Sequence, residues 1–210
     1  MQLVGRLQIQ SKQKMVEFLN QEHVGRIATI DSNGYPQVIP MNFVFFNDAI
    51  YMHSYVKGEK LENIKANSKS GFEVDKELEF LPSYFSSPTD ASMADTLYIS
   101  VVIKGQSVIV KDSGEKSLAL NAMMRKYQPE GQYEPLRSDM DVLNYTVVIK
   151  VVPEEMTGKY KIGQHMKSES RAILAHLIQK KNSPSAKETL KIMGFEETPD
   201  GLKMVDEPVW

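Results

Sequence analysis

The segment from His53 to Lys60, HSYVKGEK, combines residue types that bind phosphate groups. Ser54 supplies a hydroxyl group, and Lys57 and Lys60 supply cationic donors for an anion. Gly58 has no Cβ, so a ligand can approach the backbone closely there. The apolar residues that follow are spaced as on one face of a helix, and a helix start exposes unpaired N–H groups at its positive end. The segment therefore predicts a phosphate site.

The same residues also fit an exposed, lysine-rich helix start in which a serine acts as a cap, and this plainer interpretation is favoured for the segment taken alone. His53 stands at an expected strand end beside the phosphate site, and it is the only candidate acid or base. The spacing of the four histidines does not match a metal motif such as H-E-x-x-H, so we expect no metal site. These histidines are His23, His53, His165 and His176.

Other catalytic signatures are missing from the chain. It has no G-x-x-x-x-G-K-[ST] loop, no G-x-G-x-x-G after a strand and no G-x-S-x-G elbow. The 0 cysteines exclude disulfides, zinc–thiolate sites, iron–sulfur clusters and cysteine nucleophiles. Nucleoside triphosphatase, Rossmann dehydrogenase and α/β-hydrolase chemistry therefore lack support.

The composition is that of a globular protein. The chain has 210 residues, 41% of them hydrophobic and 25% charged, and its net charge is −2 with a pI near 6.1. This balance argues against general nucleic-acid coating. No apolar run approaches the ~20 residues of a membrane span, and the N-terminus lacks the apolar core of a signal peptide. We therefore expect a cytoplasmic protein that partners neither membrane nor nucleic acid.

Most of the first half is expected to be β-structure. After a helix over 11–21, apolar and β-branched residues predict strands over 24–31, 35–46 and 49–54, separated by turn residues. Local connections of this kind predict a three-stranded antiparallel meander. Pro36 and Pro40 cannot donate to a sheet ladder, so they indicate an edge, a bulge or a kink that faces a ligand.

The rest of the chain mixes strands and helices. We expect a helix from 57 to 67, strands over 71–75 and 144–153, and an irregular segment over 76–95. Residues 96–111 are expected to form one long strand or a pair, with a bulge at Gly105. Helices are expected over 113–127, 168–181 and 183–194. Between 159 and 191 there are eight Lys or Arg and two acidic residues, a net charge of 8 − 2 = +6. Between 196 and 207 there are five acidic residues and one Lys, a net charge of 1 − 5 = −4.

Two long stretches resemble the flavin-binding split-barrel superfamily related to pyridoxamine 5'-phosphate oxidase, and within it the nitroimidazole-resistance (Nim-type) proteins. They are GRIATIDSNGYPQVIPMNFVFFNDAIYMHSYVKGEKLENIKANSKSGFEVD and LYISVVIKGQSVIVKDSGEKSLALNAMMRKYQPEG. The resemblance covers about residues 10–160, and the order and spacing of both halves match. The Arg and His pattern with which true pyridoxamine phosphate oxidases bind substrate is not recognisable near the C-terminus, so that substrate is not predicted.

The resemblance implies a mainly β (α+β) fold, a six-stranded antiparallel split β-barrel with peripheral helices and a helical C-terminal extension. It implies an FMN-binding domain over 1–160 and an extension over 161–210 that packs on the barrel or on the dimer partner. It also implies a homodimer with FMN at the subunit interface. The flavin ring would lie along one strand segment, the phosphate at the helix start, and a second strand would face the flavin. The cofactor-binding residues it assigns are Ile39, Pro40, Met41, Asn42, His53, Ser54, Lys57, Lys60, Tyr98 and Ser100.

The activity implied is that of an oxidoreductase that passes electrons from NAD(P)H through FMN to a small acceptor, such as a nitroaromatic compound, a quinone or free flavin. One alternative leaves open whether the protein is an enzyme: it could be a non-catalytic flavin-binding transcriptional regulator of the Pai type. The basic stretch over 159–191 and a short C-terminal likeness to such regulators suggest this alternative. A second alternative is a haem-binding split-barrel protein with His53 or His165 as ligand. A deazaflavin in place of FMN also stays open.

Overall fold

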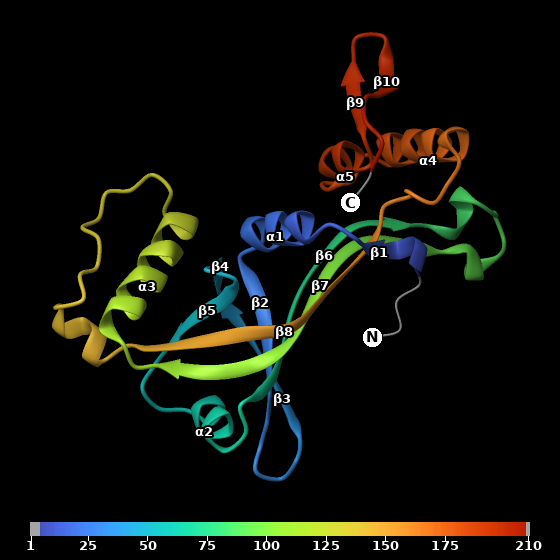
Figure 1. Cartoon of the computed structure of the whole chain (residues 1–210). Helices are drawn as coiled ribbons and strands as arrows, with labels where there is room; N and C mark the ends of the chain where they lie inside the picture. Colours follow the sequence, from blue (N-terminus) through green and yellow to red (C-terminus); the bar gives the residue numbers. More distant parts are fainter. Residues whose placement is uncertain (1–4, 209–210) are drawn as a thin grey trace. The chain divides into compact units, whose positions relative to one another are not determined.

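The computed structural model describes residues 5–208 and shows a mixed α+β fold (Figure 1). The helices of this part of the chain are α1 (Lys12–Gln21), α2 (Glu59–Ala66), α3 (Ser113–Tyr127), α4 (Ser168–Lys181) and α5 (Ala186–Ile192), with 3-10 turns at Gly5–Leu7, Ser83–Phe85, Ala91–Met93 and Asp141–Asn144. Its strands are β1 (Gln8–Ile9), β2 (Val24–Ile30), β3 (Pro36–Asn42), β4 (Val44–Phe46), β5 (Ala49–Ser54), β6 (Lys69–Leu81), β7 (Asp95–Val110), β8 (Val147–Lys161), β9 (Phe195–Thr198) and β10 (Gly201–Met204).

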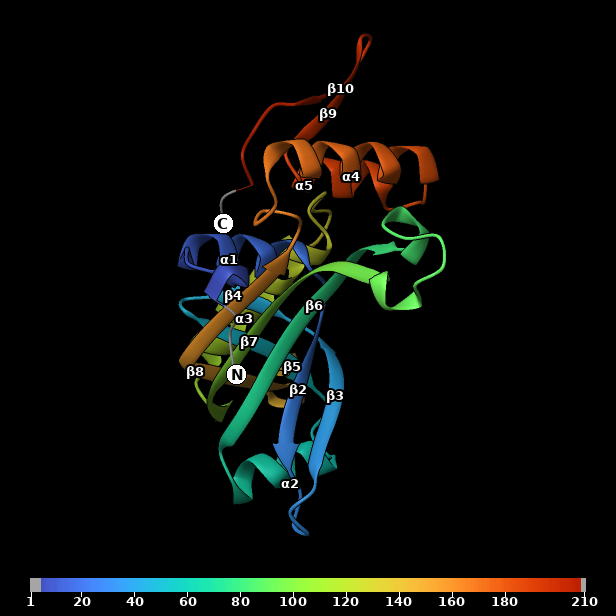
Figure 2. The same cartoon turned by 90° about the vertical axis from the view of Figure 1, so that its right-hand side faces the viewer.

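One antiparallel sheet contains eight of these strands. Seven lie in the order β3-β2-β6-β7-β8-β5-β4, and β1 pairs with β8. Figure 2 shows β6, β2 and β3 side by side. In β7 every second residue from Leu97 to Ile103 is buried, as expected for a strand with one face in the core. The sequence pattern of alternating apolar residues thus accounts for the sheet.

The sheet curls on itself because its two end strands are neighbours in the chain. β3 and β4 stand at opposite ends of the strand order, yet only Phe43 separates them. Counted as one broken strand, and with β1 set aside, they complete the six strands of the expected split barrel. The predicted fold class is confirmed.

The antiparallel pairings of the predicted three-stranded meander are present, but its middle strand is broken in two. β3 pairs with β2, from Pro36 opposite Ile30 to Asn42 opposite Val24, whereas β4 pairs with β5. The expected single strand over 35–46 is broken at Phe43, whose side chain is fully buried. The two halves pair with different strands, so the hairpin expected between 35–46 and 49–54 is reduced to the three residues of β4.

Contacts divide the chain into two compact units, which we describe separately. Unit 2 comprises 12–74 and 101–157, and unit 1 comprises 5–11, 75–100 and 158–208 of the described chain. The core of unit 2 includes a cluster beneath α3 formed by Val44, Ala49, Tyr51, Val110, Ala119, Ala122, Met123 and Val148. The expected boundary between the domains 1–160 and 161–210 stays a prediction. The outer ends of these two domains, 1–4 and 209–210, lie outside the described residues.

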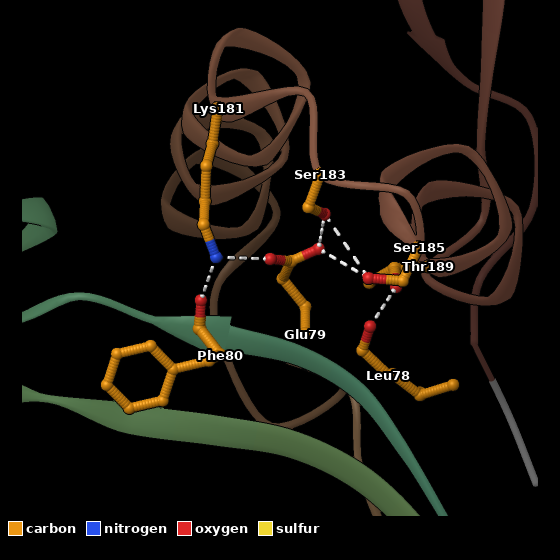
Figure 3. Close-up of polar contacts among 7 residues, drawn as sticks. All are labelled: Leu78, Glu79, Phe80, Lys181, Ser183, Ser185 and Thr189. Atoms are coloured by element: carbon orange, nitrogen blue, oxygen red, sulfur yellow. Dashed lines mark hydrogen bonds and ion pairs between the residues drawn. The ribbon is translucent and has the colours of Figure 1, made fainter.

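In unit 1, β6 extends farther than the sequence indicated. The expected strand ended at residue 75, and 76–95 was expected to be irregular, but β6 continues to Leu81. An acidic residue at position 79 argues against a buried strand in the sequence. In the structure, however, the Glu79 side chain is only 1% exposed. Figure 3 shows its partners: Lys181 donates to its carboxylate at 2.6 Å, Ser185 donates at 3.0 Å and Ser183 also donates. We call these four residues the Glu79 cluster.

The C-terminal part of unit 1 contains α4, α5 and a β-hairpin that the sequence analysis did not predict. In Figure 1 the two helices lie beside each other, and β9 and β10 follow α5. Pro199 and Asp200 form the hairpin turn, and Gly201, the first residue of β10, has φ +113°. This Pro-Asp-Gly sequence is a strong turn signal and could have revealed the hairpin.

Gly105 in β7 gives a first testable prediction about the sheet. A Cβ at this position would lie 2.1 Å from the backbone oxygen of Val152 in β8. We expect Gly105→Ala to lower the free energy of unfolding by about 1–3 kcal/mol, because rigid backbone must move to relieve the overlap. Urea denaturation would measure the change. The matched control is Gly71→Ala, whose nearest neighbour would lie 3.7 Å away and which should have little effect; equal losses would contradict the steric argument.

No helix in residues 5–208 is long and apolar enough to cross a membrane.

Candidate functional site

β3 presents an open edge in unit 2. Within the described chain its ladder partner is β2 alone, so the backbone groups on its other side are free of a strand partner. Pro40 and Asn42 are exposed and Ile39 and Met41 are half-buried. The proline lacks a backbone donor and is tolerated here because the strand is at an edge. The four residues expected along a flavin ring therefore lie on a strand whose backbone can bind a planar ligand.

The start of α2 has the features of an anion site. Gly58 caps the helix with φ 146° and ψ 152°, a backbone conformation that only glycine adopts readily, and no side chain caps the first turn. Lys57 is exposed, and Lys60 is half-buried. Ser54 is buried at the end of β5, and its hydroxyl donates to the Tyr55 carbonyl at 3.1 Å, so it would have to turn from this carbonyl to donate to a phosphate. Helix N–H groups and two lysines thus lie on the same short segment.

Two acidic residues share the first turn of α2. Glu62 is neutralised by Lys65, whose ammonium lies 2.8 Å from its carboxylate. Glu59 has no such partner among the described contacts. With Lys57 and Lys60 the helix start keeps an excess of one positive charge, which adds to the positive end of the helix dipole.

α2 is fixed to the strands that lead to the open edge. Asn63 is buried, and its side-chain amide donates to the Thr29 hydroxyl at 3.2 Å and to the Gln37 side-chain oxygen at 3.3 Å. Leu61 and Ile64, which predicted the helix, are also buried. The phosphate-binding segment and β3 therefore belong to one packed arrangement.

The break between β3 and β4 is held by a tyrosine of α3. The Phe43 N–H donates to the Tyr127 hydroxyl at 2.8 Å, and this hydroxyl points its own proton toward the carbonyls of Phe43, 3.0 Å away, and His23. Burial raises the pKa of Tyr127, so the group stays neutral. Tyr127 could not be singled out from the sequence, because its partners are backbone groups, which every residue has.

His53 and Asn42 line a cavity of about 340 Å³ beside α3. The remaining lining is mostly apolar and comes from α3 and from the segment that follows it: Leu120, Met123, Met124, Tyr127, Leu136, Val142 and Thr146. Part of the apolar face of α3 therefore borders a cavity shared with two predicted cofactor-binding residues.

Lys126 has an unusual environment next to the Tyr127 contact. Its ammonium lies 3.8 Å from the centre of the Phe43 ring and donates to the Leu19 carbonyl at 2.9 Å. Burial lowers its pKa from 10.5 to about 8, although the nearby Glu22 opposes the shift.

A pH dependence follows from the lowered pKa of Lys126. Between about pH 8 and 10.5 the unfolded chain holds a proton on this lysine that the folded protein has lost. Lys126 therefore makes the free energy of unfolding rise with pH across this window. We expect the free energy of unfolding of the wild type to rise relative to that of Lys126→Met between about pH 8 and 10.5. Urea denaturation from pH 7 to 10.5 measures both. A difference that stays constant with pH would contradict the assignment.

Tyr98 and Ser100, which the resemblance placed against the flavin, belong to unit 1. Both are half-buried in β7, and the Lys159 ammonium lies 5.3 Å from the Tyr98 ring centre. Their contact with a cofactor stays a prediction.

His165 lines a separate cavity of about 220 Å³ in unit 1, beside the ion pair of Lys161 and Asp95. Burial lowers its pKa, and the charges of Arg6 and Lys161 lower it further. A role for His165 or His53 in haem binding stays a prediction. In residues 5–208 no group of three or more His, Cys, Asp or Glu side chains could hold a metal ion.

A comparison with known families identifies the fold. The family model described as pyridoxamine 5'-phosphate oxidase matches residues 11–160, more than half of the chain. The chain belongs to this split-barrel family. The matched range contains every residue expected to bind the cofactor, and most of the C-terminal segment with α4 and α5 lies outside it. The comparison with curated proteins found no match.

Solved structures agree with the split-barrel assignment. A candidate 5-nitroimidazole antibiotic resistance protein from Bacteroides thetaiotaomicron is 25% identical, with a TM-score of 0.62 over 73% of this chain and 86% of that chain. A FAD and haem binding protein from Mycobacterium smegmatis is 17% identical, with a TM-score of 0.63 over 80% and 79%. A FAD-binding protein from Mesorhizobium loti is 19% identical, with a TM-score of 0.50 over 72% and 95%. The last two are similar in fold alone.

Proposed function

We propose that this split-barrel protein binds FMN and serves as an oxidoreductase. The observation that carries the proposal is the start of α2. The helix start combines a glycine cap, which has no side-chain cap, with two lysines and a serine. Asn63 fixes this helix to β2 and β3, and β3 carries the open edge. A phosphate group and a planar ring attached to it would match these two features.

The residues present fit a flavin mononucleotide. Ser54, Lys57, Lys60 and the N–H groups of α2 would hold the phosphate. The β3 edge from Ile39 to Asn42 would contact the ring, chiefly through backbone groups. Bound FMN would supply hydride and electron transfer, which no protein side chain can provide. The protein would orient the ring and exclude water around it.

The comparisons support a flavin without distinguishing its form. The Mycobacterium smegmatis and Mesorhizobium loti proteins are named as binding FAD, and the former also as binding haem. A single phosphate site on a short helix favours FMN. NAD(P)H as electron donor and a small acceptor, such as a nitroaromatic compound, a quinone or free flavin, complete the proposal. His53 is exposed and is proposed as a cofactor contact rather than as an acid or base.

The regulator alternative depends on the basic stretch over 159–191. Three of its eight cations form ion pairs within unit 1: Lys161 with Asp95, Arg171 with Glu207, and Lys181 with Glu79. A cation that already has a carboxylate partner contributes little to phosphate binding. These pairs favour a structural role for the segment, and salt-dependent binding of DNA would be needed to support the regulator.

The identity of the cofactor is tested by the absorption spectrum of the purified protein and by the mass of the released chromophore. We expect bands near about 375 and 450 nm, typical of oxidised flavin, and the mass of FMN. NADH and NADPH oxidation with the acceptors named above would follow. Released FAD would correct the cofactor, whereas a colourless protein that takes up no added flavin would overturn the proposal.

A homodimer with flavin between the subunits is also proposed, on the resemblance to the family. Binding at a subunit interface links cofactor affinity to assembly, so added FMN should strengthen the dimer. Sedimentation at micromolar protein concentration, with and without FMN, measures this. A flavin-loaded monomer would contradict the shared site.

A further inference from the structure

Unit 1 contains its own cavity, of about 220 Å³, where β6, β7 and β8 meet the segment that leads into α4. Its apolar lining comes from these strands, from the 3-10 turns between β6 and β7, and from α4 and the segment before it: Leu81, Phe85, Met93, Leu97, Met166 and Leu174. Its polar side chains are Ser86, Asp95, Lys161 and His165. A mostly apolar wall with a few polar groups is the usual make-up of a small-molecule site.

This cavity lies on the other face of β7 from the predicted flavin contacts. Successive side chains of a strand point to opposite faces of the sheet. Leu97 lines the cavity, so Tyr98 and Ser100 belong to the opposite face. The α4 side of the lining also follows residue 160, where the match to the family model ends. The cavity is therefore separate from the proposed cofactor site.

Hydrogen bonds outside the cavity fix the turn that carries His165. The Gln164 side chain accepts from the Ile162 N–H at 3.0 Å. It also donates to the carbonyls of Tyr160 at 3.1 Å and Arg6 at 2.9 Å, which ties the backbone of Arg6 to the same turn. The His165 ring itself makes no hydrogen bond among the contacts described for residues 5–208, so its donor is available to a ligand.

Cations outnumber carboxylates around the His165 ring. Lys161 is balanced by its ion pair with Asp95, whose carboxylate also accepts from the Thr96 N–H at 2.8 Å. Arg6 forms no ion pair among those described for residues 5–208. Burial lowers the pKa of His165, and the charges of Arg6 and Lys161 lower it further, whereas Asp95 opposes the shift. The surroundings of the ring therefore carry an excess of one positive charge, which a single monoanion would balance.

We propose that this cavity binds the anion of a small monocarboxylic acid, with its apolar body among the apolar lining residues and its carboxylate at Ser86 and His165. The serine hydroxyl and an imidazole N–H each supply a donor, and hydrogen bonds to a charged acceptor are the strong ones. A volume of about 220 Å³ is below the ~300–1,000 Å³ of common ligand pockets, which favours one ring or a short branched chain. A dianion is disfavoured, because only one nearby cation is unbalanced.

The test uses phenylacetate as the probe and phenylacetamide as a neutral analogue of the same shape. Calorimetry at pH 7 measures the affinity of each for the 210-residue chain. We expect phenylacetate to bind about tenfold more tightly, because only its carboxylate makes charge-assisted hydrogen bonds and balances the excess charge. Equal affinities, or no binding of phenylacetate at millimolar concentration, would overturn the proposal.

Polar variants test the carboxylate contacts. His165→Leu removes the ring donor and should weaken binding of phenylacetate about tenfold. The matched control is His176→Leu, because His176 is an exposed histidine of α4 that does not line the cavity. Arg6→Gln removes the unbalanced charge, and it should weaken phenylacetate about threefold while phenylacetamide binds as before. Phenylacetate affinities that are unchanged in the His165 and Arg6 variants would refute these contacts.

Cavity-filling variants locate the probe. Met166→Trp should remove measurable binding of phenylacetate. Ile173→Trp is its matched control, because Ile173 is 63% exposed on α4 and does not line the cavity. Met93→Trp fills the cavity from the 3-10 turn before β7 and replaces the first variant if that one does not fold.

The outcomes separate this inference from the proposed function. Met166→Trp should leave FMN affinity unchanged, and a parallel loss of FMN would overturn the assignment of a separate site. Phenylacetate that binds equally well to wild type and to both filled variants overturns the cavity site even if FMN binds. A chain that takes up no flavin but binds phenylacetate, with loss in the filled variants, supports the cavity site and overturns only the proposed function.

Discussion

Replacing Lys181 by methionine is expected to lower the free energy of unfolding by about 3 kcal/mol, because the change leaves the buried carboxylate of Glu79 without its cation. Glu79 is 1% exposed, and Lys181 donates to it at 2.6 Å (Figure 3). The hydroxyls of Ser183 and Ser185 remain, but two neutral donors do not balance a buried charge. Methionine keeps the length and packing of the lysine stem. Urea denaturation at pH 7 measures the loss.

Lys180→Met provides the matched control, since Lys180 is the preceding residue of α4 and is exposed. We expect the control to change stability by less than about 0.5 kcal/mol. Similar losses in the two variants would show that the charge pair is unimportant.

Acidification should reduce the difference between wild type and Lys181→Met. Burial alone would raise the pKa of Glu79, but the hydrogen bonds from Lys181, Ser183 and Ser185 outweigh it and hold the pKa below 4.5. This carboxylate therefore stabilises the wild type above its unfolded pKa, and the contribution is lost as the pH falls through the folded pKa. In the variant the carboxyl group is protonated more readily, so the penalty fades. A penalty of equal size at pH 7 and 4 would contradict this explanation.

Replacing both Lys57 and Lys60 by alanine is expected to weaken FMN binding about 100-fold, because each charge-assisted hydrogen bond to phosphate contributes about 1.5 kcal/mol. Riboflavin has the same ring system without the phosphate, so its affinity should change less than about twofold. Fluorescence titration of both ligands at one fixed salt concentration gives the two ratios.

The double variant Lys69→Ala, Lys111→Ala makes the same change in net charge on unit 2 at two exposed positions away from the start of α2. It should leave FMN affinity nearly unchanged. Equal losses of affinity for FMN and riboflavin in the Lys57, Lys60 variant would refute a phosphate role for these lysines. An equal loss of FMN affinity in both double variants would show that only the net charge of the protein matters.

Local sequence signals were sufficient for several elements. α3 and α4 begin and end at the expected residues, and β5 matches the expected strand over 49–54. In each case the pattern of apolar residues and the flanking turn or cap residues agree with the final packing. The phosphate-binding segment was also identified locally, because its hydroxyl, glycine and lysines lie within one short stretch that ends at a helix start.

Other features depend on partners that are distant in sequence. The extension of β6 through Glu79 requires a cation and hydroxyls that lie about a hundred positions later. The break at Phe43 requires the Tyr127 hydroxyl, 84 positions away. No local pattern reports such contacts, which is why a strand was expected to end early and another to continue unbroken.

The sequence by itself determined the family, the order of most strands and helices, and the residue types for phosphate binding, because these follow from local spacing and from a resemblance over most of the chain. Tertiary structure decided where the strands go. It placed β3 and β4 at opposite ends of the sheet order, opened the β3 edge and brought Asn42 and His53 to a cavity beside α3. The reason is physical: a cavity and an open edge are properties of packed surfaces, and packing joins residues that the chain itself keeps apart.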